Sequence, residues 1–138
     1  MKKILLAIPI AAMLLAGCGS EEAKMPEDTE GKIEWRVKEE YRSTDVDHIT
    51  LNPNSGTKDK NDKVALIYLI WNVKNTVSTS KEMLNLHSKD LAAFVYENCP
   101  EVSEFAVFWE VPYHDGNAKL SFKRKKSGMR LTDEKYLL

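Results

Sequence analysis

Cys18 has the clearest chemical context in this chain, because its thiol follows an N-terminal leader of secretory type. The first three residues include two lysines, and residues 4–14 form an apolar run. This run is shorter than the ~20 apolar residues that a membrane-spanning helix needs. The side chains immediately before the thiol are small, as a signal peptidase requires. We therefore predict that residues 1–17 are a signal peptide, cut between Gly17 and Cys18.

The four residues Leu15-Ala16-Gly17-Cys18 resemble the lipobox of bacterial lipoproteins at every position. The resemblance implies a diacylglyceryl group on the Cys18 sulfur and an anchor of fatty acids such as palmitate in the lipid bilayer. Two acyl chains hold a protein stably, at ~0.8 kcal/mol per buried methylene. The implied location is the extracytoplasmic face of the cell membrane. In an organism with an outer membrane, Gly19 favours sorting to that membrane. The alternative is an ordinary signal peptide with a chance cysteine.

The second cysteine, Cys99, has no partner within the chain if Cys18 carries lipid. No intrachain disulfide then exists, and the domain depends on packing for its stability. Cys99 stands beside Pro100, at the predicted end of a helix. We interpret it as a buried, unreactive thiol, with a disulfide between two chains as the alternative.

Side chains that bind metals or act in catalysis are scattered along the chain. His48, His87 and His114 lack the close spacing that zinc sites often use. The acidic loop at residues 59–62 lacks the glycine and glutamate positions of a calcium loop, so we interpret it as solvated. The sequence contains no nucleophile elbow and no glycine-rich phosphate loop. We predict no catalytic residue, no metal site and no cofactor.

The run Lys123-Arg124-Lys125-Lys126 is the strongest charge feature of the chain. On a strand its alternate members point to opposite faces, so the run is not one continuous patch. We interpret it as a charged edge strand that blocks association between sheets. The alternative is a site for an anionic partner: lipid headgroups, wall teichoic acids or an acidic protein face. Nucleic acid is not predicted, because no recognition fold accompanies the run.

Trp109 is the second candidate for partner binding, within the aromatic-rich segment 105–113. On a strand, Trp109 lies on the face of Phe105 and Val107, and Phe108 lies on the opposite face. The two interpretations are a core residue and an aromatic side chain that binds a ligand.

Hydrophobic periodicity predicts the elements that position these residues. Ile33, Trp35 and Val37 alternate with polar residues and predict a half-buried strand. Further strands are predicted over residues 46–51, 64–73, 105–111 and 118–123, the last two joined by a turn at Asp115-Gly116. A capping-box pattern and Pro100 predict a helix over Thr79–Asn98. Residues 129–138 are expected to be a tail without assigned structure.

The predicted fold is α+β, with a mostly antiparallel sheet of about five strands in the order β-β-β-α-β-β and one amphipathic helix on one face. Residues 18–31 are expected to be the lipidated cysteine with a flexible acidic tether, and residues 32–138 a single small domain. The other sheet face is then partly uncovered. Trp71 or Trp109 on that face would form a recognition surface.

These features favour an extracytoplasmic lipoprotein that acts as a non-catalytic binding module. The small, cysteine-poor α+β plan resembles uncharacterised lipoproteins of Gram-positive bacteria. Some of those are carried by mobile elements and exclude redundant conjugative transfer by contacting the secretion machinery. An exclusion protein of this kind and a small envelope enzyme are the two alternatives.

Overall fold

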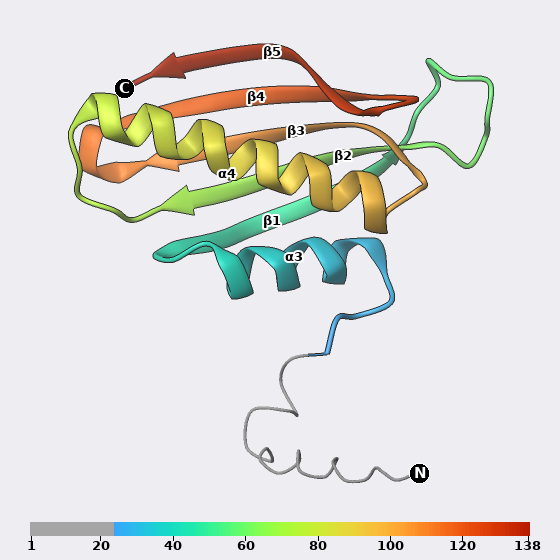
Figure 1. Cartoon of the computed structure of the whole chain (residues 1–138), viewed down its shortest axis with the longest axis horizontal. Helices are drawn as coiled ribbons and strands as arrows, with labels where there is room; N and C mark the ends of the chain where they lie inside the picture. Colours follow the sequence, from blue (N-terminus) through green and yellow to red (C-terminus); the bar gives the residue numbers. More distant parts are fainter. Residues whose placement is uncertain (1–23) are drawn as a thin grey trace, which may run out of the picture.

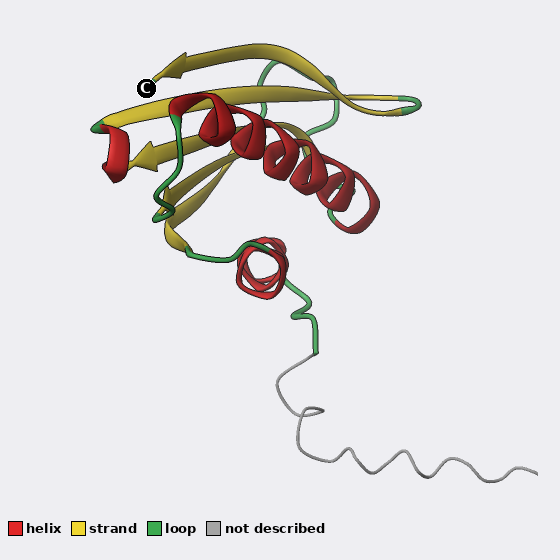
Figure 2. Cartoon of the chain, turned by 60° about the vertical axis from the view of Figure 1, so that its left-hand side comes forward, coloured by secondary structure: helices red, strands yellow, loops and turns green. Residues whose placement is uncertain are grey.

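The computed structural model describes residues 24–138, so the predicted signal peptide, the predicted lipobox with Cys18 and the start of the predicted tether lie outside the described residues. The described chain forms a five-stranded sheet with two α-helices on one face (Figures 1 and 2). The elements in chain order are α3 (Thr29–Glu40), β1 (Thr44–Pro53), β2 (Lys63–Trp71), α4 (Val77–Asn98), β3 (Val102–Val111), η2 (Pro112–His114), β4 (Gly116–Lys125) and β5 (Gly128–Leu137). The α+β class is therefore confirmed, whereas the predicted element order and the single helix are wrong.

The strands lie in the sheet in chain order, β1-β2-β3-β4-β5. Three neighbouring pairs are antiparallel and the pair β2–β3 is parallel. A parallel pair needs a long crossover connection, and α4 provides it. The turn predicted at Asp115-Gly116 is confirmed, because Asp115 adopts a left-handed φ of 49° and Val111 pairs with Gly116.

The strand predicted at Ile33, Trp35 and Val37 is wrong, because these residues belong to α3. Ile33 and Val37 are both 0% exposed. Residues four positions apart share one face of a helix as well as one face of a strand, so the alternation was ambiguous. Trp35 is half-buried, and its ring lies 6.2 Å from that of Phe94 on α4.

The start of α3 also shortens the predicted flexible tether. The Asp28 carboxylate accepts a hydrogen bond from the Gly31 N–H at 2.9 Å, which satisfies one free donor at the helix N-terminus. Thr29 is buried. Residues 29–31 are therefore part of the folded domain, contrary to the predicted boundary at Lys32.

The predicted long helix is confirmed as α4, although it begins at Val77 and not at Thr79. Thr76 is the N-cap, and its hydroxyl accepts a hydrogen bond from the Thr79 N–H at 3.1 Å. The helix ends at Asn98, before the buried Cys99 and Pro100.

The last residues form strand β5 and not a tail without assigned structure. β5 pairs along the length of β4, so β4 lies inside the sheet and its interpretation as a charged edge strand is wrong. The register shifts opposite Ser121 and Phe122, so β5 has an extra residue there. Such a bulge interrupts the period-two alternation that would have marked the strand in the sequence.

The core lies between the helices and one face of the sheet. Alternate residues of β2 and β3 are buried on this side, and those of β3 include Phe105, Val107 and Trp109, as predicted. Trp71 and Trp109 are each 1% exposed. The prediction that either tryptophan lies on the uncovered face is therefore wrong, because both side chains point to the same side of the sheet as the core residues.

Candidate binding surface on the open face of the sheet

We define the open face as the side of the sheet opposite the two described helices. Side chains alternate along a strand, and paired residues on neighbouring strands point to the same side. Parity and register place on it a set from all five strands: His48, Thr50, Val64, Leu66, Tyr68, Ile70, Glu104, Ala106, Phe108, Glu110, Asn117, Lys119, Ser121, Lys123, Lys125, Arg130, Asp133 and Lys135. The open face therefore carries an apolar band on β2–β3 beside a basic band on β4–β5.

An aromatic row crosses the open face from β1 to β4. His48, Tyr68, Phe108 and Lys119 are successive register partners. The ring centroids of His48 and Tyr68 are 4.1 Å apart, those of Tyr68 and Phe108 are 4.6 Å apart, and Lys119 Nζ lies 5.8 Å from the Phe108 ring. The strands are ~4.8 Å apart, so the rings stack on one another and present their edges outward. The row is a ridge and not a flat platform.

The basic band contains two cross-strand pairs of like charge. Lys119 lies opposite Lys135, and Lys123 lies opposite Arg130. All four side chains are exposed. Within residues 24–138, none of the ion pairs includes these four cations. Like charges directly opposite one another destabilise a sheet. Glu104, the register partner of Lys123 on β3, offsets part of this cost at one of the two pairs.

Trp109, a predicted partner-binding residue, is placed in the core. Its indole Nε1 donates a hydrogen bond to the Ser88 hydroxyl of α4 at 2.8 Å, and Ser88 is 0% exposed. A buried tryptophan requires such a partner for its N–H. Phe108, its neighbour, is the residue of this segment that reaches the open face.

Arg124 lies apart from the other members of the basic run. Its guanidinium points to the helix side and donates hydrogen bonds to the carbonyl oxygens of Val102, Cys99, Tyr96 and Val95 at 2.8, 3.0, 3.2 and 3.4 Å. It thus binds the C-terminal end of α4. Arg124 lies two residues after the apolar Phe122, so on a strand the two side chains point to the same side. This spacing could have placed Arg124 on the core side from the sequence alone.

The other members of the basic run are exposed. Lys123 and Lys125 lie on the open face, as alternation predicts. Lys126 lies in the turn between β4 and β5, where its carbonyl oxygen accepts a hydrogen bond from the Tyr96 hydroxyl at 2.7 Å. The sequence prediction missed Lys119 and Lys135, because neither stands in the run.

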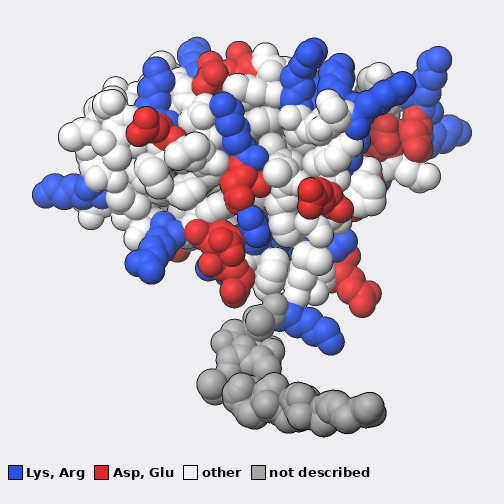
Figure 3. Space-filling model, viewed as in Figure 1, with Lys and Arg blue, Asp and Glu red and all other residues white. Residues whose placement is uncertain are grey.

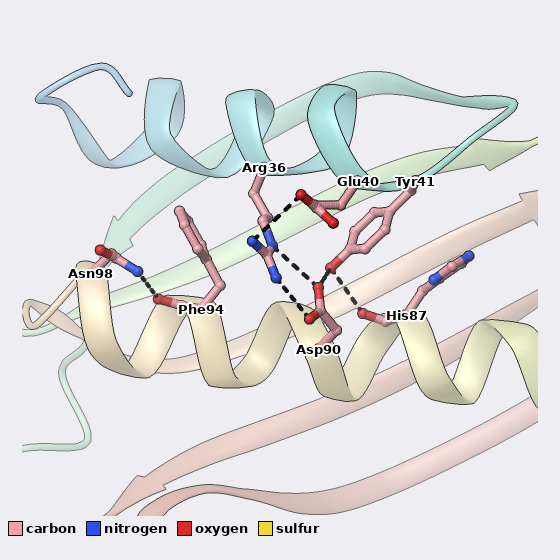
Figure 4. Close-up of polar contacts among 7 residues, drawn as sticks. All are labelled: Arg36, Glu40, Tyr41, His87, Asp90, Phe94 and Asn98. Carbon is pink, nitrogen blue, oxygen red and sulfur yellow. Dashed lines mark hydrogen bonds and ion pairs between the residues drawn. The ribbon is translucent and has the colours of Figure 1, made fainter. Parts of the chain in front are cut away.

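A polar cluster joins the two helices (Figure 4). The Asp90 carboxylate accepts hydrogen bonds from the Arg36 guanidinium at 2.8 and 3.2 Å and from the Tyr41 hydroxyl at 2.5 Å. The Tyr41 hydroxyl also lies 3.1 Å from the His87 carbonyl oxygen. We interpret the cluster as the contact that holds α3 against α4, because its donors and acceptors are used by one another.

Electrostatics in this cluster agree with a structural role. Burial, with a contribution from Asp90, raises the pKa of the Tyr41 phenol. Partial burial of Asp90 opposes ionisation, but the hydrogen bonds from Arg36 and Tyr41 outweigh it and lower the pKa of its carboxyl. Burial lowers the pKa of His87, against the Asp90 charge. Tyr41 therefore stays a neutral donor and Asp90 an ionised acceptor.

The remaining predicted chemistry stays scattered. His48, His87 and His114 lie on β1, α4 and η2, and residues 24–138 contain no group of three side chains suited to hold a metal.

Cys99 is a free thiol with 0% exposure, and burial raises its pKa to about 11. The interpretation of Cys99 as a buried thiol is confirmed. In the loop, the Asp59 carboxylate accepts the Asn61 N–H at 2.8 Å.

The helix side of the molecule has a different surface. Acidic and basic side chains are interspersed in the view of Figure 3. Ala92, Phe122, Met129 and Leu131 help to line a groove of about 380 Å³ between α4 and the β4–β5 hairpin. None of the helices within residues 24–138 has the length and apolar character to span a membrane.

Comparison with known proteins finds no protein-family model, no curated protein and no solved structure that matches this chain.

Proposed function

We propose that this protein is a lipid-anchored binding module on the extracytoplasmic face of the cell membrane, in the outer membrane where the organism has one. It contacts an envelope partner through the open face of its sheet and catalyses no reaction. The lipobox Leu15-Ala16-Gly17-Cys18 supports the anchor. In this proposal the bilayer holds the acylated Cys18, and a short acidic tether lets the domain reach its partner.

The observation that carries the binding role is the apolar band on the open face. A sheet with one solvated face normally alternates between apolar residues on the core side and polar residues on the solvent side. β2 departs from this pattern, because Val64, Leu66, Tyr68 and Ile70 all point away from the helices. These side chains are half-buried, and Phe108 extends the band onto β3. An apolar band of this kind is typical of an interaction surface.

Metabolic labelling tests the anchor. Cells that produce the wild-type chain should incorporate labelled palmitate into it, and Cys18→Ser should leave an unlabelled, uncut precursor. Equal labelling of the two proteins would refute the lipid anchor. Cys99 is a built-in control, since Cys99→Ser should not change the labelling.

Site-specific photo-crosslinking in cells tests the binding surface. A photoreactive residue at Thr50 or Ser121 on the open face should give a discrete crosslinked product. The same residue at the exposed positions Glu82 or Lys89 on α4 should not. Products of equal yield from both sides of the molecule, or from α4 alone, would overturn the assignment of the open face.

A further inference from the structure

We propose that the open face binds an extended acidic polypeptide segment along β4 and β5, with carboxylates at positions i and i+4 and a neutral residue at i+2. This inference rests on the proposed binding function and names the chemistry of the partner. It uses features of the two strands that the binding role alone does not require.

The first feature is the charge of the band. The pairs Lys119–Lys135 and Lys123–Arg130 place four cations on two strands. None of the four forms an ion pair among the described residues, although Glu104 on β3 is the register partner of Lys123. A carboxylate that binds between the two cations of a pair adds two attractions, which offset the repulsion between the cations. Complementary charge of this kind selects an acidic partner and speeds its association.

The second feature is the distance between the two pairs. Lys119 and Lys123 are four residues apart on β4, so their Cα atoms are separated by roughly 13 Å along the strand. An extended polypeptide has the same repeat, and its residues i and i+4 point to one side at the same separation. The two pairs can therefore each meet one carboxylate of a single strand-like segment.

The third feature is the position between the pairs. Ser121 lies opposite Asp133 there, and the Asp133 side chain is exposed. A carboxylate at i+2 would face the Asp133 carboxylate, and like charges repel. A hydroxyl or another neutral side chain at i+2 avoids this contact. The basic band therefore distinguishes peptides by the positions of their carboxylates and not only by their total charge.

A polypeptide fits this surface better than a lipid bilayer. The large apolar side chains that are most exposed among the described residues are Met25, Val77, Leu86, Tyr113 and Leu137. Only Leu137 lies on a strand of the basic band, at its end beside Asn117. The apolar band itself is half-buried and presents ring edges, so it offers no wedge for insertion into a membrane. It does offer apolar contacts to the side chains that flank a bound strand.

Peptide binding tests the pattern. The full-length chain, purified in detergent, is titrated with labelled peptides of threonine, serine and two glutamates, which differ only in glutamate spacing. The i/i+4 peptide should bind roughly 10-fold more tightly than the i/i+3 peptide, whose second carboxylate points away. A third glutamate at i+2 should not tighten binding, despite the added charge. Equal affinity for the two spacings, or tighter binding of the three-glutamate peptide, would overturn the proposal.

Charge reversal supplies the matched variants. Lys119→Glu with Lys135→Glu should abolish the preference for the i/i+4 peptide and create one for a peptide with lysine at one of the two positions. The control reverses Lys58 and Lys60, two exposed lysines of the β1–β2 loop. A loss of affinity in the control as large as in the test variant would refute the site.

Vesicles containing anionic phosphatidylglycerol test whether the partner is a membrane surface. They should bind the wild-type protein no more tightly than the protein with Lys119→Glu and Lys135→Glu. Vesicle binding that depends on Lys119 and Lys135, without peptide discrimination, would overturn the polypeptide partner in favour of a membrane surface. Crosslinking from the open face would still support the binding module in that case, so the two proposals fail separately.

Discussion

Replacement of Arg124 by alanine should destabilise the fold although the residue stands in an exposed basic run. The last carbonyl groups of a helix have no partner within the helix, and a cation near them is favoured by the helix dipole. Arg124 provides such a cation at the end of α4, where it donates to the carbonyl oxygens of Val95, Tyr96 and the C-cap Cys99. It also donates to the carbonyl oxygen of Val102 at the start of β3. The Val95 and Cys99 oxygens accept backbone N–H groups as well. Arg124 also lies against the Tyr96 ring, with its Cζ 4.7 Å from the centroid.

The magnitude follows from these contacts. A hydrogen bond from a charged donor contributes ~1.5–3 kcal/mol when its loss leaves the acceptor unpaired. Arg124 is half-buried, so water replaces part of the loss, and the two longer contacts contribute little. We expect Arg124→Ala to lower the free energy of unfolding by about 2–4 kcal/mol, or the melting temperature by roughly 8–16 °C. Arg124→Lys should have an intermediate effect, because an ammonium group reaches fewer of the carbonyls.

Urea unfolding of residues 24–138, followed by circular dichroism, measures this change. Lys123→Ala and Lys125→Ala are the flanking controls, and each should change the free energy by less than ~0.5 kcal/mol, because both side chains are exposed on the other face. An Arg124→Ala protein as stable as the wild type would refute the reasoning. Equal losses at all three positions would refute it as well.

Three further predictions concern the core and the contact between the helices. Ser88→Ala should lower the free energy of unfolding by about 1–3 kcal/mol, because it leaves the buried Trp109 N–H without an acceptor. Trp109→Phe should then lower the free energy of unfolding by less in the Ser88→Ala protein than in the wild type. A double-mutant cycle of urea unfolding measures this difference. Asp90→Asn should destabilise the domain by about 1–2 kcal/mol at neutral pH. Because the pKa of Asp90 is lowered by folding, its contribution is present above the ordinary carboxyl pKa of ~4 and is lost as the pH falls through the lower folded value, so the gap between variant and wild type should close in acid. Cys99 should react with a thiol reagent at pH 8 at least ~100-fold more slowly in the folded chain than in urea, because it is buried and its pKa is raised to about 11.

Each of these measurements has an outcome that contradicts the structural argument. Strictly additive effects of Ser88→Ala and Trp109→Phe would mean that the two side chains do not interact. A constant gap between Asp90→Asn and the wild type down to pH 2 would show that the Asp90 charge is not what stabilises the contact. Rapid modification of Cys99 under native conditions would place its thiol at the surface.

The elements that could be predicted are those whose pattern has a single physical interpretation. The long helix α4 shows apolar residues at helical spacing up to Asn98, followed by Pro100, and every second residue of β3 from Phe105 to Val111 is apolar and buried. α3 shows how a short pattern misleads, because Ile33 and Val37 share a face in either structure. The Asp28 N-cap and the contacts of α3 with Asp90 and the core together select the helix.

The candidate surface was predicted in part for the same reason. Alternation correctly separated Lys123 and Lys125 from Arg124. The basic band also needs Lys119 and Lys135, which lie 16 residues apart in the numbering and meet only because β5 pairs with β4. Residues 64–73 are apolar on both faces, which predicts a central strand that is either covered on both sides or covered on one and shielded by a partner on the other, and the sequence could not decide between these two.

By itself the sequence determined the local properties of this protein: the resemblance of residues 15–18 to a lipobox, the alternation along β2 to β4, and the end of the long helix before Pro100. These depend on residues that are neighbours in the chain. The tertiary structure decided that residues 128–137 close the sheet, that both described helices cover the same face, and that four cations therefore meet on the other one. Those outcomes depend on the register between distant strands and on which face the helices bury, and neither property is encoded within a single segment.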